Sequence, residues 1–246
     1  MSEACLQLDV GNSGAKWRLV TVAGVLERGT YRRDDEASRD VLLALEPFPT
    51  RIWISSVAAA TVEDELTHLL RGRWGVEPWF ARTAARSGEL VNSYAEPSRM
   101  GVDRWLAMLG ARARHHGRLC VVDAGSALTV DLVADNGAHE GGYIIPGPAL
   151  MERALLLDTD RVRFDEDIGY SLDPGRSTAE AVRHGIALAQ AGAVKLALAS
   201  AGAPQPALFF CGGAGQTLQA LAEVGGTWVP DLVFEGLEVM AAYDAR

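Results

Sequence analysis

Short apolar runs, bounded by glycine or polar residues, alternate along this chain with longer segments whose apolar residues recur at helical spacing. In the first half, this pattern predicts strands at 6–9, 17–22, 26–31, 51–57 and 77–81, and helices at 38–45, 62–70 and 102–114. The segment 87–101 is polar and contains a proline, so we expect a loop there.

The second half repeats the same order of elements. It predicts strands at 119–122, 129–134, 140–145 and 207–210, and helices at 149–157, 179–200 and 215–224. Asp135-Asn136-Gly137 is a strong hairpin turn. Each half thus begins with a hairpin and continues with alternating strands and helices, which indicates α/β layers. We expect two related halves, residues 1–116 and 117–246.

Composition limits the possible partners and the compartment. The 246 residues carry a formal net charge of −9, which argues against binding to a nucleic-acid backbone. The first residues lack a basic stretch followed by an apolar core, and no apolar run approaches the roughly 20 residues of a membrane span. We therefore expect a cytoplasmic protein with neither a membrane nor a nucleic-acid partner.

The cysteines and histidines suggest no metal centre. Cys5, Cys120 and Cys211 are far apart, form no zinc spacing, and are interpreted as small core residues in buried strands. The five histidines also lack metal-ligand spacing, and we interpret them as solvent-facing or helix-end residues. No nucleophile-elbow motif suggests a Ser–His–Asp arrangement.

Two short segments look like copies of one another and are typical of phosphate-binding turns. They are Asp9-Val10-Gly11-Asn12-Ser13 and Asp123-Ala124-Gly125-Ser126-Ala127, each directly after an apolar strand. Glycine lets such a turn bring backbone N–H groups close to a phosphate, and paired aspartates can hold a metal ion. Lys16 follows the first turn and has the reach to contact a terminal phosphate. The alternative is an ordinary hairpin in which Asp9 only forms the turn.

The segment Gly101-Val102-Asp103-Arg104 lies where the polar loop becomes a helix. A carboxylate at this point can accept a proton from a hydroxyl group, and an adjacent guanidinium can bind an anionic group with two hydrogen bonds. A helix N-terminus also favours a negative charge, so Asp103 has a purely structural alternative as a cap.

Two further glycine-rich segments are less specific. Gly141-Gly142-Tyr143-Ile144-Ile145-Pro146-Gly147 follows the second turn, and its glycines are also explained by close packing against the neighbouring hairpin. Cys211-Gly212-Gly213-Ala214-Gly215 joins a strand to a helix, as many nucleotide loops do, and equally suits a simple strand-to-helix turn. It follows the duplicated hairpins rather than opening the chain, which disfavours a Rossmann fold.

Taken together and in this order, these motifs resemble those of the type III pantothenate kinases, a branch of the acetate and sugar kinase, actin and chaperone-ATPase superfamily. Lesser matches are Ser55-Ser56-Val57, Tyr94, Ser177-Thr178, Gly212-Gly213 and Glu235-Gly236-Leu237. The resemblance spans essentially the whole chain. It implies an α/β fold of two duplicated ribonuclease H-like (actin-like ATPase) halves, with mixed sheets flanked by helices, and ATP-dependent phosphorylation of pantothenate, the first step towards coenzyme A.

The resemblance also implies roles for individual residues. Asp103 would accept the proton of the pantothenate hydroxyl, Asp9 would help to hold Mg²⁺, and Asp123 would bind a monovalent cation, K⁺ or NH₄⁺. The implied ATP contacts are Asp9, Val10, Gly11, Asn12, Ser13, Gly14, Ala15, Lys16 and Ser126. The implied pantothenate contacts are Tyr94, Gly101, Val102, Asp103, Arg104 and Thr178. Family members are homodimers whose pantothenate pocket lies near the subunit interface.

Two other functions stay open at this point. A phosphohydrolase of the same superfamily would use water in place of the hydroxyl group, which the Gly-x-Asp-Arg segment disfavours. A non-catalytic accessory or regulatory protein would be favoured by loss of Asp9 or Asp103, and both residues are present.

Overall fold

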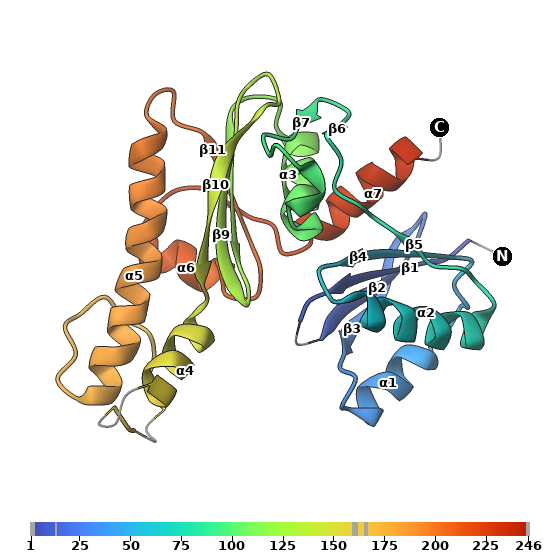
Figure 1. Ribbon diagram of the computed structural model, residues 1–246, viewed down its shortest axis with the longest axis horizontal. Coiled ribbons are helices and arrows are strands. Elements are labelled where there is room, and N and C mark those ends of the chain that lie inside the picture. Colours follow the sequence, from blue (N-terminus) through green and yellow to red (C-terminus); the bar gives the residue numbers. More distant parts are fainter. Residues whose placement is uncertain (1–2, 13, 159–161, 165–166, 245–246) are drawn as a thin grey trace. The chain divides into compact units, whose positions relative to one another are not determined.

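The computed structural model describes residues 3–12, 14–158, 162–164 and 167–244 (Figure 1). Its contacts divide the chain into two compact units. The first unit combines residues 1–88, 94–110 and 233–246, and the second combines residues 89–93 and 111–232. The C-terminal helix therefore packs with the first unit. The duplication boundary that we drew after residue 116 stays a prediction.

The first unit is built on a five-stranded mixed sheet with the order β3-β2-β1-β4-β5. β1 pairs antiparallel with β2 and parallel with β4. The strands are β1 (Cys5–Val10), β2 (Ala15–Thr21), β3 (Gly24–Tyr31), β4 (Arg51–Ser56) and β5 (Trp79–Phe80). The helices are α1 (Glu36–Leu43), α2 (Ala60–Trp74), α3 (Val102–Arg114), whose last turn is assigned to the second unit, and α7 (Leu232–Asp244).

The second unit repeats this topology in a sheet with the order β10-β9-β8-β11-β12. β8 pairs antiparallel with β9 and parallel with β11, as β1 does with β2 and β4. The strands are β8 (Leu119–Ala124), β9 (Ala127–Val133), β10 (His139–Pro146), β11 (Ala207–Cys211) and β12 (Thr227–Trp228), and the helices are α4 (Pro148–Asp158), α5 (Thr178–Ala201) and α6 (Gly215–Ala222). The duplication expected from the sequence is confirmed.

Most predicted elements are present, with ends shifted by a few residues. The helix predicted at 62–70 extends over Ala60–Trp74, and the strand predicted at 77–81 shrinks to Trp79–Phe80. The segment expected to be a loop is only partly one, because it holds β7 (Leu90–Val91) and a 3-10 turn at Pro97–Arg99, and β6 (Arg86–Ser87) overlaps its start. The polar segment 162–175 lies partly outside the described residues.

Strand alternation decides which side chains build each core. In the first unit, Leu6, Leu8 and Trp17 point to the face covered by α1 and α2, where they pack with Leu42 and Leu66 (Figure 1).

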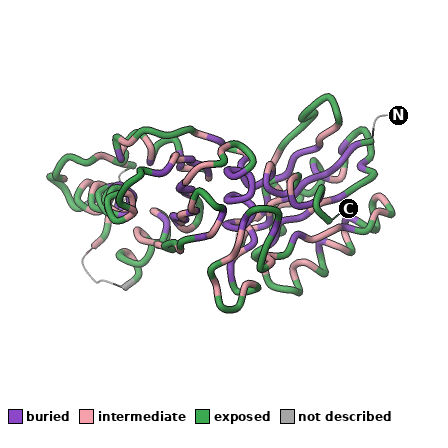
Figure 2. Tube along the Cα trace, turned by 90° about the horizontal axis from the view of Figure 1, so that it is seen from above, coloured by how far each residue is buried: buried purple, intermediate pink, exposed green. Residues whose placement is uncertain are grey.

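In the second unit, Val122, Leu128 and Phe210 pack against Val194 of α5 and Leu218 of α6. Buried residues are concentrated in the central strands of each sheet and along α3, whereas β3 and β10 are largely exposed (Figure 2). All three cysteines are buried and free, as expected for core residues. In the described ranges, no helix is long and apolar enough to cross a bilayer.

A buried polar network fixes α7 to the opposite face of the first sheet. The Arg18 side chain is 7% exposed and donates to Glu238 of α7 at 2.9 Å and to Gln7 of β1 at 2.7 Å. Gln7 also donates to Glu238 at 3.0 Å. The guanidinium lies 4.8 Å from the ring centroid of Phe234, which adds a cation–π contact. α7 is therefore held by hydrogen bonds as well as by apolar burial.

We predict that Glu238→Ala destabilises the protein by about 1–3 kcal/mol, because buried donors of Arg18 and Gln7 lose their acceptor. The control is Glu3→Ala, which removes an exposed ion pair with Arg51 and should change stability by less than about 0.5 kcal/mol. Urea denaturation followed by circular dichroism measures both variants. Equal effects of the two substitutions would show that the network does not anchor α7.

Candidate active site

The first phosphate-binding turn joins β1 to β2. Its ends are closed by a hydrogen bond from the Gly11 amide to the Gly14 carbonyl, at 2.9 Å. Register places Asp9 beside Lys16 on β2 and beside Ser55 on β4. Ser13, one of the predicted ATP contacts, lies outside the described residues.

The side chains of this turn divide between the two faces of the sheet. Val10 and Ala15 are buried, and their side chains pack in the core under α1 and α2. By alternation, Asp9, Lys16 and Ser55 lie on the opposite face. The Ser55 hydroxyl donates to Asp9 Oδ1 at 3.0 Å, and this fixes the orientation of the carboxylate.

The Asp9 carboxyl group is poorly stabilised as an anion. Burial raises its pKa to about 6, and the negative charge of Asp103 contributes in the same direction. The hydrogen bond from Ser55 and the charge of Lys16 oppose this shift but do not cancel it. The structure thus brings two predicted site carboxylates, Asp9 and Asp103, into one electrostatic environment.

Asp103 lies in the first turn of α3, where its side chain forms a hydrogen bond with the backbone of the helix. Its Oδ1 accepts a hydrogen bond from the Arg104 amide at 2.7 Å. A β-carbon added to Gly101 would lie 2.6 Å from that same oxygen, so the absent side chain leaves room for the carboxylate. Val102 is buried. Asp103 therefore accepts a hydrogen bond within the first turn of α3 and also interacts electrostatically with Asp9.

Arg104 is buried, with 5% of its surface exposed, although it carries a charge. Its Nη1 donates to the Tyr94 hydroxyl at 2.9 Å, and its guanidinium lies 5.9 Å from the centroid of the Tyr94 ring. Two residues predicted to contact the substrate, ten positions apart in the sequence, are therefore brought together in the first unit.

The second phosphate-binding turn is closed by a similar backbone hydrogen bond but is one residue shorter than the first. The Gly125 amide donates to the Ala127 carbonyl at 2.9 Å. Ala214, after β11, donates to Ala124 at 3.0 Å, just as Val57, after β4, donates to Val10 at 3.0 Å. These paired hydrogen bonds show that the two turns occupy equivalent places in their units.

The glycine-rich segments close around the second turn. The Gly147 amide donates to the Ser126 carbonyl at 3.1 Å. Gly212 has a φ of +80°, and a β-carbon there would clash with the Asp123 carboxylate and the Ala124 carbonyl. Only glycine therefore allows the β11–α6 loop to approach Asp123 so closely. Both explanations of Gly212 given above, a strand-to-helix turn and a nucleotide loop, require the same close contact with Asp123.

Ser126 and Thr178 are exposed in the second unit. Thr178 is the first residue of α5, whose N-cap Ser177 accepts a hydrogen bond from the Glu180 amide at 3.2 Å.

Sequence reasoning missed one hydrogen-bonded chain and one site neighbour. His139 is wholly buried, bonds to Asp131 at 3.1 Å and to Ser93 at 2.8 Å, and so ties segment 89–93 to β10. We interpreted every histidine as solvent-facing or helix-terminal. This interpretation is wrong for His139, which lies in β10 and is buried. Ser55 was missed as a partner of Asp9 because parallel strand register is not visible in the sequence.

The carboxylates fit a divalent cation. Two nearby anionic groups, one with a raised pKa, are stabilised by a positive ion, and Mg²⁺ prefers oxygen ligands. Within the described residues, no cluster of three or more metal-ligating side chains occurs, so most ligands of such an ion must come from phosphate groups and water. A cavity of about 650 Å³, lined in part by Gly11, Asn12 and Gly14, opens beside the turn.

Two sheets of the same order, each with an Asp-x-Gly turn between its first antiparallel strands, define an actin-like ATPase fold. Solved structures agree. A Campylobacter jejuni protein described as a Baf family transcriptional activator matches with a TM-score of 0.62 and 22% identity, covering 98% of each chain. MreB 5 of Spiroplasma citri, bound to AMPPNP, matches with a TM-score of 0.51 and 10% identity, over 100% of this chain and 98% of its own.

Sequence comparisons narrow the class to one family. The model of the type III pantothenate kinases matches residues 5–199. The type III pantothenate kinase of Hahella chejuensis is 37% identical over 240 residues, covering 96% of each chain. That of Thiobacillus denitrificans is 35% identical over 249 residues, covering 100% of each. This chain belongs to the type III pantothenate kinases, and ATP and a divalent metal are the cofactors that this kinase family uses.

We predict that, without ligand, the Asp9→Asn variant becomes increasingly more stable than the wild type as the pH rises. The Asp9 pKa is raised in the folded state, so the wild type loses stability between about pH 4 and 6 as this group ionises, and the asparagine variant does not. In buffer free of divalent ions, the difference should grow to at most about 3 kcal/mol above pH 7. The control is Asp40→Asn, which changes an exposed carboxylate on α1. Thermal melts from pH 4 to 8 test this, and parallel curves for wild type and Asp9→Asn contradict it.

Proposed function

We propose that this protein transfers the γ-phosphoryl group of ATP to the primary hydroxyl of pantothenate, giving 4′-phosphopantothenate, the first step towards coenzyme A. The observation that carries the proposal is the Asp103–Arg104 pair at the start of α3, within the electrostatic influence of Asp9 at the first turn. Membership of the family supplies the identity of the substrates.

The reaction requires positioning and charge neutralisation more than covalent chemistry. The pantothenate oxygen attacks the γ-phosphorus, the bond from that phosphorus to the β,γ-bridging oxygen breaks, and ADP leaves. Asp103 accepts the hydroxyl proton late in the step. A carboxylate with an ordinary pKa suffices, because the departing proton becomes acidic only as the new bond forms.

The nucleotide phosphates are bound by the first turn. The side chains of Asn12, Ser13 and Lys16 would provide donors together with backbone N–H groups of the turn other than that of Gly11, and Ser126 would add a contact from the second turn. Asp9 would hold Mg²⁺, which neutralises phosphate charge when it is bound. The raised pKa of Asp9 supports this role, since a bound cation favours the ionised carboxylate that burial and the charge of Asp103 disfavour.

Pantothenate carries a carboxylate at the end remote from its reacting hydroxyl. Arg104, oriented by Tyr94, is the proposed partner of that carboxylate, because a guanidinium binds it with two parallel hydrogen bonds. Gly101 and Val102 would contribute backbone contacts, and Thr178 would add a hydroxyl group.

A monovalent cation, K⁺ or NH₄⁺, is proposed at Asp123. Thr129 is the register partner of Asp123, and the Asp123 carboxylate and the Ala124 carbonyl both lie beside Gly212, so this position offers several oxygen atoms. We also propose a cytoplasmic homodimer without a nucleic-acid partner. Three free, buried cysteines suit a reducing compartment, and the net charge of −9 opposes binding to phosphate backbones. A monomeric mass in analytical ultracentrifugation would contradict the dimer.

We predict that Asp103→Asn lowers turnover by about 10²–10⁴-fold, because asparagine keeps the helix-start hydrogen bond but cannot accept the proton. The matched control is Asp35→Asn, which alters a carboxylate that caps α1 by accepting from Ala37. Pantothenate-dependent ADP release measures both variants. Turnover of Asp103→Asn within a few-fold of the control would reduce Asp103 to a helix cap.

Arg104→Lys should raise the KM for pantothenate by about tenfold or more while the KM for ATP changes little. Lysine keeps the charge but loses the planar fork that matches a carboxylate. Steady-state kinetics with each substrate varied in turn provide the measurement. An equal rise of both KM values would assign Arg104 to the phosphates or to the fold instead.

Activity should depend on a monovalent cation. In Tris buffer free of potassium and ammonium, we expect little turnover, restored by KCl or NH₄Cl and poorly by NaCl or LiCl. Asp123→Ala should remove both the dependence and most of the activity. Full activity without an added monovalent cation would refute the role of Asp123 and leave the kinase assignment intact.

A further inference from the structure

One arginine outside the family motifs lies directly on the first phosphate-binding turn. β3 ends at Tyr31, whose register partner is Ala15, and the next residue, Arg32, therefore comes beside Gly14. A β-carbon added to Gly14 would lie 3.3 Å from Cγ of Arg32 and 2.9 Å from the Tyr31 carbonyl. The aliphatic stem of Arg32 thus packs on the turn at a position where only glycine leaves room for it.

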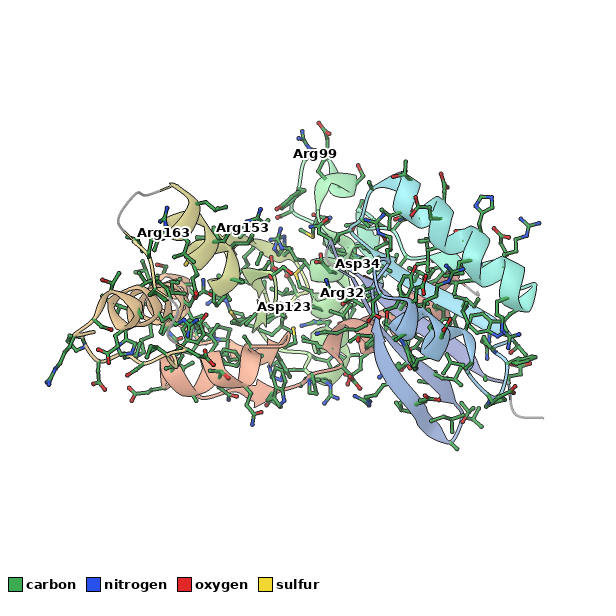
Figure 3. The ribbon with its side chains drawn as sticks, turned by 90° about the horizontal axis from the view of Figure 1, so that it is seen from below. Arg32, Asp34, Arg99, Asp123, Arg153 and Arg163 are labelled. Carbon is green, nitrogen blue, oxygen red and sulfur yellow. The ribbon has the colours of Figure 1, made fainter. Side chains whose placement is uncertain are left out.

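The Arg32 guanidinium is held in place by an acidic neighbour. Its Nε and Nη2 donate to the two oxygens of Asp34, at 3.3 and 3.4 Å, and the two side chains lie side by side in Figure 3. The two side chains are 59% and 75% exposed. An ion pair this exposed contributes little to stability, so another anion can replace Asp34 at small energetic cost.

Both residues line the cavity of about 650 Å³ that opens beside the turn, together with Gly11, Asn12 and Gly14. The neighbouring Arg33 is paired with Glu65 of α2 at 3.4 Å. Arg32 therefore combines three properties: contact with the turn, access to the cavity, and a weakly bound carboxylate partner.

We propose that Arg32 binds the terminal phosphates of the nucleotide and exchanges the Asp34 carboxylate for a phosphate group. The proposal rests on the proposed function, since it assigns the nucleotide to this turn. A phosphate offers more charge than a carboxylate and suits the two-pronged geometry of a guanidinium. Asp34 keeps the guanidinium oriented in the free protein and competes with the nucleotide for it.

This competition makes opposite predictions for the two partners. Loss of Arg32 removes a ligand contact and weakens nucleotide binding. Loss of the Asp34 charge removes the competitor and strengthens binding. A pair with a purely structural role would give the same sign for both substitutions, because either change breaks the same contact.

Isothermal titration of the full chain with Mg²⁺ and either AMPPNP or AMP tests the proposal. We expect Arg32→Ala to weaken AMPPNP binding about tenfold, Arg32→Lys to weaken it less, and Asp34→Asn to tighten it by a few-fold. AMP, which lacks the terminal phosphates, should bind all variants alike. The matched controls are Arg51→Ala and Glu3→Gln, which change an exposed ion pair at the other end of the sheet and should behave as wild type.

Unchanged AMPPNP affinity in Arg32→Ala, or weakening in both Arg32→Ala and Asp34→Asn, would overturn the proposal, as would equal loss of AMP affinity. If the alanine variant fails to fold by circular dichroism, the lysine and Asp34→Asn variants decide the sign. Failure of the proposed function can be distinguished from failure of the Arg32 proposal. A wild type that binds AMPPNP through Arg32 but does not phosphorylate pantothenate refutes the substrate assignment alone.

Discussion

The candidate site depends on Asp9, a partly buried carboxylate whose neighbour is a second carboxylate, Asp103. Asp9 closes β1 on the face opposite the apolar core, and burial together with the charge of Asp103 raises its pKa to about 6. Such a pair is unfavourable unless positive charge is supplied. Ser55 and Lys16 compensate only in part, so the turn is suited to a cationic partner such as Mg²⁺ bound to nucleotide phosphates.

The duplicated architecture separates two tasks between similar turns. Asp9 and Asp123 occupy equivalent places, yet their register neighbours differ. Asp9 lies between Lys16 and Ser55, whereas Asp123 lies between Thr129 and Cys211. The first turn therefore has a basic side chain, Lys16, beside its aspartate, whereas the second has the Thr129 hydroxyl and a closely approaching glycine loop. The same backbone fold thus presents different chemistry in each unit.

Much of this was accessible from the sequence, because the relevant signals are local. The strands and helices of each half, the two Asp-x-Gly turns and the start of α3 follow from apolar periodicity and turn residues. Register across parallel strands is not local, so the Ser55–Asp9 hydrogen bond was missed. The buried pair of His139 and Asp131 lies in an antiparallel hairpin whose register shifts between His139 and Gly141, and this irregularity is not visible in the sequence. The packing of α7 with the first unit also escaped prediction, since it depends on the distant partners Gln7 and Arg18.

Product analysis tests the central claim most directly. Purified protein is incubated with ATP, Mg²⁺, KCl and pantothenate, and the mixture is analysed by mass spectrometry and ³¹P nuclear magnetic resonance. The account predicts 4′-phosphopantothenate in equal amount to ADP, with no ADP formed when pantothenate is omitted. Inorganic phosphate in place of phosphopantothenate, formed whether or not pantothenate is present, would contradict the account and indicate a phosphohydrolase.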